Sequence, residues 1–148
     1  MLRWFPGLVA LLVLVSACLP GLDPDPRLLV TIESHGGLCA DGGECRSTIQ
    51  IRSDGAIVRA GAQPSIVAHA GTAQIARLES EIAAADLRAL ASRKFTGTCP
   101  TAYDGQEIVY RFPSPTGEIR LASCEVELDP THPLFEAIAA VLSALGGS

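Results

Sequence analysis

The sequence has few basic residues and few aromatic residues. It contains 148 residues, with 11 Lys and Arg against 16 Asp and Glu, and its formal net charge is −5. Its basic residues are scattered, so the chain lacks the positive patch that attracts nucleic acid or an anionic membrane surface. Only 5% of the residues are aromatic, which leaves too few rings for a base-stacking platform. We therefore expect no nucleic-acid partner.

The sequence also lacks the common catalytic and metal-binding patterns. It has no Gly-x-Ser-x-Gly elbow, and its three histidines, His35, His69 and His132, are isolated from one another. We expect His132 to cap the helix that follows it. His35 and His69 are interpreted as exposed loop or strand-end residues. These absences predict no catalytic residue, no cofactor and no metal.

An acidic segment follows the last cysteine. Glu125 and Glu127 share one face of an extended segment, with Asp129 next in register. Such a cluster could serve acid–base chemistry, but no apolar residues surround these carboxylates. We interpret the segment as a solvated edge.

No run of about 20 apolar residues, the length needed to span a bilayer, is present. The longest is Leu8–Val15, which follows Arg3 and lies within a segment where 13 of the first 17 residues are apolar. A short positive region followed by a short apolar run is typical of a secretory signal peptide. We assign residues 1–17 to a cleaved signal peptide, which leaves a chain of ordinary globular hydrophobicity.

Residues 15–18, Val-Ser-Ala-Cys, resemble the lipobox of bacterial lipoproteins: an aliphatic residue and two small residues before a cysteine. The resemblance implies that Cys18 is lipidated and becomes the first residue of the mature protein, anchored to a membrane of the cell envelope. The alternative is a plainly secreted protein. Leu19 follows, where an Asp would resemble an inner-membrane retention signal. In a host with two membranes, the destination implied is therefore the outer membrane, on its periplasmic side, or the cell surface.

Residues 18–27 contain the anchor and a proline-rich tether, and we expect a single globular domain over 28–148. Prolines at positions 20, 24 and 26 cannot form a helix or a ladder strand, so the tether is extended.

Four cysteines remain, an even number in an exported chain, and this predicts two disulfides with three possible pairings. The local spacing favours Cys39–Cys45, which leaves Cys99–Cys124 as the second pair. A metal site made of His35, Cys39 and Cys45 is the alternative, but it lacks the paired close spacing of zinc motifs.

Alternating apolar and polar residues predict strands over 28–34, 47–53, 56–60, 107–112 and 118–123, and residues 66–69 are compatible with one more short strand. Helical spacing predicts a helix capped by Thr72, a short helical turn after Asp86, and a final helix beginning at Pro130 or Pro133. The expected fold is α+β: an antiparallel β-sheet of about four to five strands, with two main helices packed on one face and two disulfides. The other face of the sheet is expected to be polar and open to water or to a partner.

Two loops could carry recognition. Residues 35–43 are rich in glycine, but no helix follows to complete a phosphate cradle, so we interpret them as a disulfide-stapled surface loop. Tyr103 and Asp104 lie in an exposed turn of the kind used for ligand or partner contact, although they could simply form the turn that enters the next strand.

The first functional hypothesis is a lipid-anchored extracytoplasmic protein with a non-catalytic binding or interaction domain, whose ligand is unknown and whose partner is an envelope protein. One alternative is protease inhibition. Over roughly residues 28–145, the order of strands, helix, hairpin and terminal helix, with residues 83–91 closing the first helix, is similar to emfourin-type inhibitors of thermolysin-like metalloproteases. The lipobox and the four cysteines are additions to that pattern, and we transfer no functional residue. The other alternative is an envelope hydrolase that uses His35 or His132 with nearby carboxylates.

Overall fold

The structure, a computed structural model, describes residues 25–38 and 44–146. The predicted signal peptide, Cys18, most of the tether and Cys39 lie outside these residues. In chain order the elements are β1 (Leu28–Leu38), β2 (Glu44–Arg52), β3 (Ala56–Arg59), β4 (Ser65–His69), α1 (Thr72–Ala84), α2 (Leu87–Ala91), the 3₁₀ helix η1 (Pro100–Tyr103), β5 (Glu107–Ser114), β6 (Gly117–Ala122), α3 (Pro133–Leu142) and the 3₁₀ helix η2 (Ser143–Gly146).

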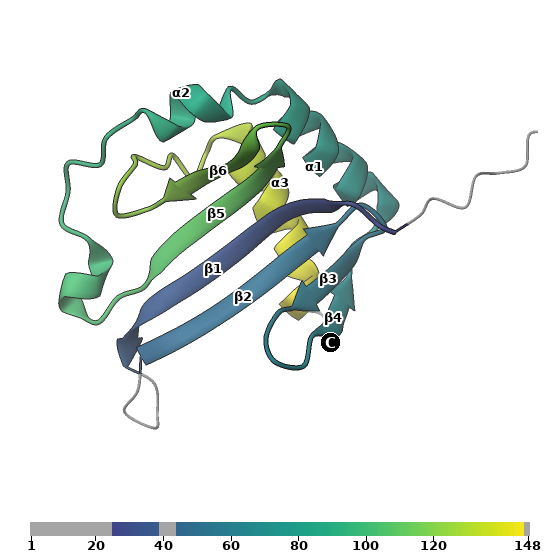
Figure 1. Ribbon diagram of the computed structural model, residues 1–148, viewed down its shortest axis with the longest axis horizontal. Helices are drawn as coiled ribbons and strands as arrows, with labels where there is room; N and C mark the ends of the chain where they lie inside the picture. Colours follow the sequence, from purple (N-terminus) through teal and green to yellow (C-terminus); the bar gives the residue numbers. More distant parts are fainter. Residues whose placement is uncertain (1–24, 39–43, 147–148) are drawn as a thin grey trace, which may run out of the picture.

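The strands form one antiparallel sheet in the order β4-β3-β2-β1-β5-β6 (Figure 1). The predicted α+β class is confirmed, but the expected count of four to five strands is too low, because the sheet has six. The sixth strand is β4, a five-residue edge strand that contains residues 66–69, the segment compatible with one more short strand. Its side chains are mostly exposed or half-buried, so its sequence carries little of the alternation that marks a half-buried strand.

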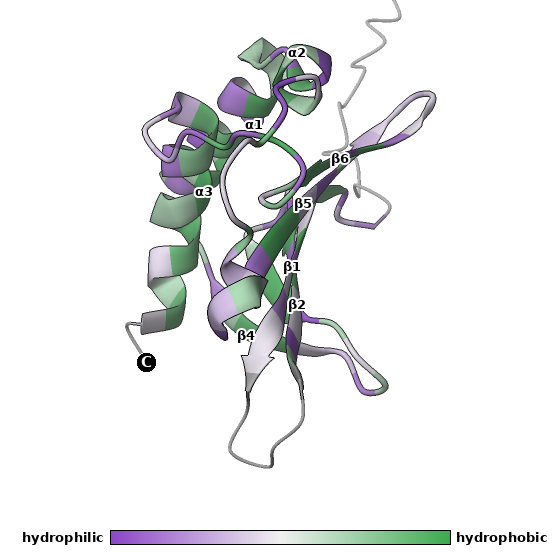
Figure 2. Cartoon of the chain, turned by 90° about the vertical axis from the view of Figure 1, so that its left-hand side faces the viewer, coloured by the Kyte–Doolittle hydropathy of each residue, from purple (hydrophilic) through white to green (hydrophobic). Residues whose placement is uncertain are grey.

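Helices α1 and α3 cover one face of the sheet, and the two layers are seen edge-on in Figure 2. A third helix, the short α2, contacts β6. The helix-facing side follows from the register: Ile32 of β1 lies opposite Ile49 of β2 and Tyr110 of β5. Burial of these apolar residues against the helices forms a single core. Its fully buried members on the sheet and helices include Val30, Ile51, Ile57, Leu78, Phe112, Leu121, Leu134, Ile138 and Val141.

Helix α1 begins one residue earlier than its capping pattern predicts. The N-cap is Gly71 rather than Thr72, and the side chain of Gln74 accepts a hydrogen bond from the Gly71 N–H at 2.9 Å. The Gln74 amide also donates to the carbonyl of Ala140 in α3, at 2.7 Å. The same glutamine therefore satisfies a helix terminus and ties the two covering helices together.

Helix α3 begins at Pro133, and His132 is its N-cap, as predicted. The His132 Nδ1 accepts a hydrogen bond from the Leu134 N–H at 3.3 Å. Just upstream, Asp129 accepts hydrogen bonds from the Thr131 hydroxyl and N–H, and these bonds lower the pKa of the Asp129 carboxyl below its ordinary value. The final helix thus has a polar turn at its start.

Strands β1 and β2 extend further than the alternating pattern predicts. β1 continues through His35 to Leu38, and His35 lies opposite Arg46 of β2 and Glu107 of β5. The glycine-rich run is thus partly strand, with a register shift between His35 and Leu38. Gly36 and Gly37 adopt φ values of 102° and 73° there. Glycine tolerates this left-handed backbone, which explains why a strand can continue through residues with no strand pattern.

Candidate binding face

The sheet face opposite the helices carries a band of charged side chains on β1, β5 and β6. Figure 1 looks onto this open face, with α3 behind the sheet. Antiparallel pairing places Glu33 opposite Val109, and His35 opposite Glu107. Cross-strand neighbours point to the same side of a sheet. The open face therefore carries the charged side chains predicted from alternation, but it also contains the buried apolar residues Val109 and Ala122.

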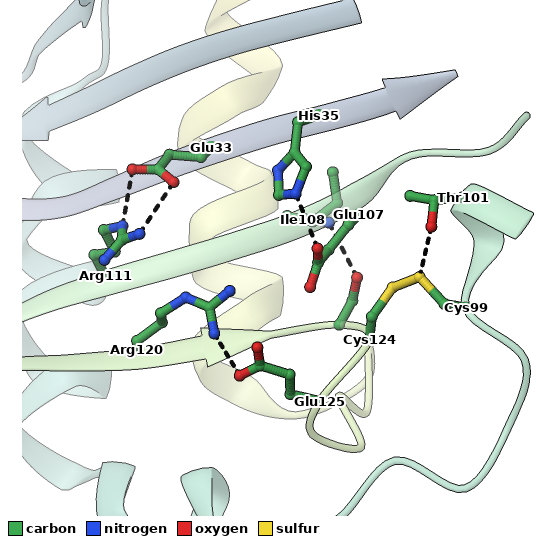
Figure 3. A network of polar contacts seen from close by, with 11 residues as sticks. Glu33, His35, Cys99, Thr101, Glu107, Ile108, Arg111, Arg120, Cys124 and Glu125 are labelled. Atoms are coloured by element: carbon green, nitrogen blue, oxygen red, sulfur yellow. Dashed lines mark hydrogen bonds and ion pairs between the residues drawn. A yellow bond between two sulfur atoms is a disulfide. The ribbon is translucent and has the colours of Figure 1, made fainter. Parts of the chain in front are cut away.

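Arg111 links three strands of the open face. Its Nε and Nη2 donate to the two carboxylate oxygens of Glu33 on β1, at 2.8 and 3.3 Å (Figure 3). Its Nη1 donates to Glu118 on β6 at 2.8 Å. Hydrogen bonds with Glu118 and Glu33 raise the pKa of Arg111 above its ordinary value. The guanidinium fork is suited to bidentate pairing with a carboxylate, so it holds Glu33 in one orientation.

His35 and Glu107 form a second cross-strand pair nearer the end of β1. The His35 Nε2 lies 2.9 Å from a carboxylate oxygen of Glu107, and the Glu107 side chain is only 13% exposed. Of the two histidines named in the hydrolase alternative, His35 therefore lies beside a carboxylate on the open face, whereas His132 caps α3. The pair could move a proton to or from a bound group.

The acidic segment after Cys124 does not act as one cluster. Glu125 pairs with Arg120 of β6, while Asp129 binds Thr131 at the start of α3. Within the described ranges, no group of three or more His, Cys, Asp and Glu side chains is arranged to hold a metal ion.

A disulfide-held loop borders the open face. Cys99 and Cys124 form the predicted disulfide, with their Cα atoms 5.0 Å apart. It joins the start of η1 to the residues after β6, and Figure 3 shows it close to the end of β5 that carries Glu107. The other predicted pair, Cys39–Cys45, includes a residue outside the described chain and stays a prediction.

The loop projects Tyr103 into solvent. Tyr103 is 79% exposed and is the last residue of η1, immediately before Asp104. Asp104 has a positive φ of 58°, and the Gly105 N–H donates to the carbonyl of Pro100 at 2.9 Å. Aspartate tolerates this left-handed conformation better than most residues. These backbone features fix the conformation of the turn that carries Tyr103.

The other side of the loop rests on the glycines of β1. A side chain at Gly36 would place its Cβ 2.7 Å from a methyl carbon of Thr101, and one at Gly37 would place it 2.8 Å from the carbonyl oxygen of Asp104. These distances are too short for any Cβ, so only glycine lets the loop lie this close. Tyr103 and Asp104 are therefore carried by a loop supported by a disulfide and by backbone contact.

Several cavities formed by the described residues lie away from this loop, and two of them differ in lining. One, of about 570 Å³, lies where the tether enters the domain and is lined by polar residues that include Arg27, Ser53 and Glu79. The other, of about 200 Å³, is lined mainly by apolar residues between β5 and α3, including Tyr110, Leu128 and Phe135. Neither is lined by the predicted contact residues, Tyr103 and Asp104.

The structure places the predicted contact residues, Tyr103 and Asp104, in a loop that packs against Gly36 and Gly37 of β1. The clamp of Arg111 with Glu33 and Glu118 was not predicted as part of a site. Alternation placed Arg111 on the open face, but a strand pattern does not reveal which strand becomes its neighbour. That neighbour is β1, which lies about 75 residues earlier in the chain.

Comparison with protein-family models and with curated proteins finds no match for this chain.

Proposed function

We propose that this protein is a lipid-anchored lipoprotein of the cell envelope, held to a membrane through Cys18, whose domain is a non-catalytic binding module for an envelope protein partner. The binding surface is the loop that carries Tyr103 together with the adjoining charged band of the open face. The observation that carries this proposal is the exposure of Tyr103, 79%, on a loop held by a disulfide and by Gly36 and Gly37.

Two physical properties favour this surface as the binding site. Tyrosine offers a large amphipathic contact area with little rotamer entropy to lose, and it is enriched at binding hot spots. A loop that is already ordered loses less entropy when a partner binds. The charge pairs beside it, such as Glu107 with His35, would form the polar rim.

The test is partner capture by crosslinking in intact envelopes, with the full chain as bait. Tyr103→Ala is expected to reduce capture at least about tenfold, as removal of an interface hot spot does. Its thermal midpoint should stay near that of the wild type, because the side chain makes few contacts in the free protein. Ser80→Ala, exposed on α1, is the matched control and should leave capture unchanged. Equal capture by both variants would contradict the proposed surface.

The anchor has its own test. Cys18→Ala removes the acceptor of the lipid, so the chain should no longer incorporate labelled fatty acid and should leave the detergent phase on phase separation. Unchanged lipid labelling or unchanged membrane retention in Cys18→Ala would overturn this part of the proposal. Among the described residues, no helix is both long and apolar enough to cross a membrane.

Protease inhibition is the second candidate, because a loop held at both sides resembles what an inhibitor presents to a protease. Purified protein should then inhibit a thermolysin-like metalloprotease in a titratable manner, and Tyr103→Ala should weaken that inhibition. Retention of binding by His35→Ala and His132→Ala, together with no hydrolytic activity in the wild type, would argue against the hydrolase alternative.

A further inference from the structure

Strand β4 is an edge of the sheet with no charged residue to protect it. It runs Ser65-Ile66-Val67-Ala68-His69, contains no proline, and pairs on one side with β3. No other described strand pairs with its outer side (Figure 1). Ile66 is 58% exposed there. An unpaired edge presents backbone N–H and C=O groups that can accept another strand.

The opposite edge is different. β6 carries Glu118 and Arg120, both engaged in ion pairs. Helix α2 contacts this strand, and a bridge between Lys94 and Val126 lies after its end. Charged residues and covering segments are the usual ways in which proteins block an edge. Strand β4 is contacted by η2, and its pairing with β3 contains a register shift. Unlike β6, however, β4 carries no Asp, Glu, Lys or Arg, so the two edges of this sheet differ in charge.

We propose that β4 is a pairing edge for a second copy of this chain, joined antiparallel about a twofold axis through Val67. In that register, Ile66 lies opposite Ala68 of the second copy, and Ser65 lies opposite His69. None of these residues carries a fixed charge, so two chains of net charge −5 can meet there without like charges opposite one another.

A second copy fits this edge better than the chain's own tether. Residues 20, 24 and 26 of the tether are prolines, which lack the N–H that a ladder strand must donate. A homodimer also pairs the β4 edge of each copy in a single interface, because an antiparallel pair of identical strands is self-complementary.

The pairing should be weak in solution and stronger on a membrane. A five-residue strand buries much less than the roughly 1,200 Å² of a stable interface. Anchoring both chains in one membrane raises their effective concentration. This second expectation rests on the proposed lipid anchor, whereas the edge pairing itself does not.

The test uses the full chain in intact cells, with a photo-crosslinking residue at position 65 or, as the control, at the exposed position 80 on α1. Position 65 should give a covalent homodimer and position 80 should not. Adding Ile66→Lys should reduce the dimer roughly tenfold, because it places charge on both strands of the pair. Adding Ile66→Thr, which introduces a neutral residue that favours strands, should leave the yield of dimer unchanged. Circular dichroism verifies that both variants fold.

The outcomes separate the proposals. Absence of dimer at position 65, equal dimer at position 80, or crosslinks from position 65 to another protein in place of a second copy would overturn the edge pairing. Less dimer in Cys18→Ala, restored by raising the protein concentration, would support pairing assisted by the anchor. If Cys18→Ala remains on the membrane, the proposed lipid anchor is contradicted. The yield of dimer crosslinked at position 65 still tests the pairing of β4 in that case.

Discussion

At the scale of single residues, Arg111 of β5 connects three strands of the open face. It bonds Glu33 and Glu118 at once, yet all three side chains are about a third to a half exposed. Solvent screening keeps such pairs weak. We expect Arg111→Ala to lower the free energy of unfolding by only about 1 kcal/mol in urea titrations. Glu118→Gln, which leaves the Glu33 pair intact, should cost less, and an equal or larger loss would contradict this assignment.

Tyr110 gives the pH dependence at this scale. Its ring packs against Phe135 with centroids 5.1 Å apart, and burial raises the pKa of the Tyr110 hydroxyl above its ordinary value of 10.0. The unfolded state therefore releases this proton first as pH rises. The contribution of the neutral Tyr110 hydroxyl to the free energy of unfolding is fully present below pH 10. It is lost as pH rises through the pKa that Tyr110 has in the folded state. Absorbance titration of Tyr103→Phe, in which Tyr110 is the remaining tyrosine, should show ionisation only above pH 10. Ionisation at or below pH 10 would contradict the burial.

At the scale of elements, the contact between β1 and the loop of η1 depends on Gly37. A Cβ there would lie 2.8 Å from the carbonyl of Asp104, and φ is 73°. We expect Gly37→Ala to cost about 2 kcal/mol of stability, from backbone strain and from displacement of the loop. Gly61→Ala is the matched control, because a Cβ at Gly61 meets nothing within 4 Å. A similar midpoint of urea unfolding for both variants would show that the loop does not rest on this glycine.

The elements also show where sequence patterns succeed. Alternation in β5 and β6 predicts that Tyr110, Phe112 and Leu121 share the face that meets the helices. It does not predict that Val109 and Ala122, on the other face, are also buried. The pattern does not predict that β1 and β2 continue beyond Ser34 and before Ser47. That extension depends on partners such as Glu107, opposite His35. Pairing between distant segments is a tertiary property that no short window of sequence contains.

In the candidate site, too, local features were predicted from the sequence and tertiary contacts were not. Exposure of Tyr103 and the Cys99–Cys124 bond were predicted from a turn sequence and from cysteine parity. The support that Gly36 gives the loop was not predicted, because a glycine-rich run alone also fits an open surface loop. Only the approach of Thr101 reveals why glycine is required there.

At the scale of the whole molecule, one core connects the sheet with both covering helices. Leu78 of α1 and Ile138 of α3 are almost fully buried and belong to the same cluster as Phe112 of β5. No layer can therefore lose its partner without exposing the apolar face of the other. Such a domain should unfold in a single cooperative transition.

Leu78→Ala tests this coupling. Removing a fully buried leucine side chain should cost about 3 kcal/mol, the usual range for a cavity in a packed core. The far-UV signal of the helices and the near-UV signal of Tyr110 in the sheet should shift together to the same lower urea midpoint. Leu87→Ala, at a half-buried position of α2, should shift both signals by less. If Leu78→Ala moved the helix signal and left the Tyr110 signal in place, the helices and the sheet would be separate folding units, because a shared core requires both probes to report the loss of the same contacts.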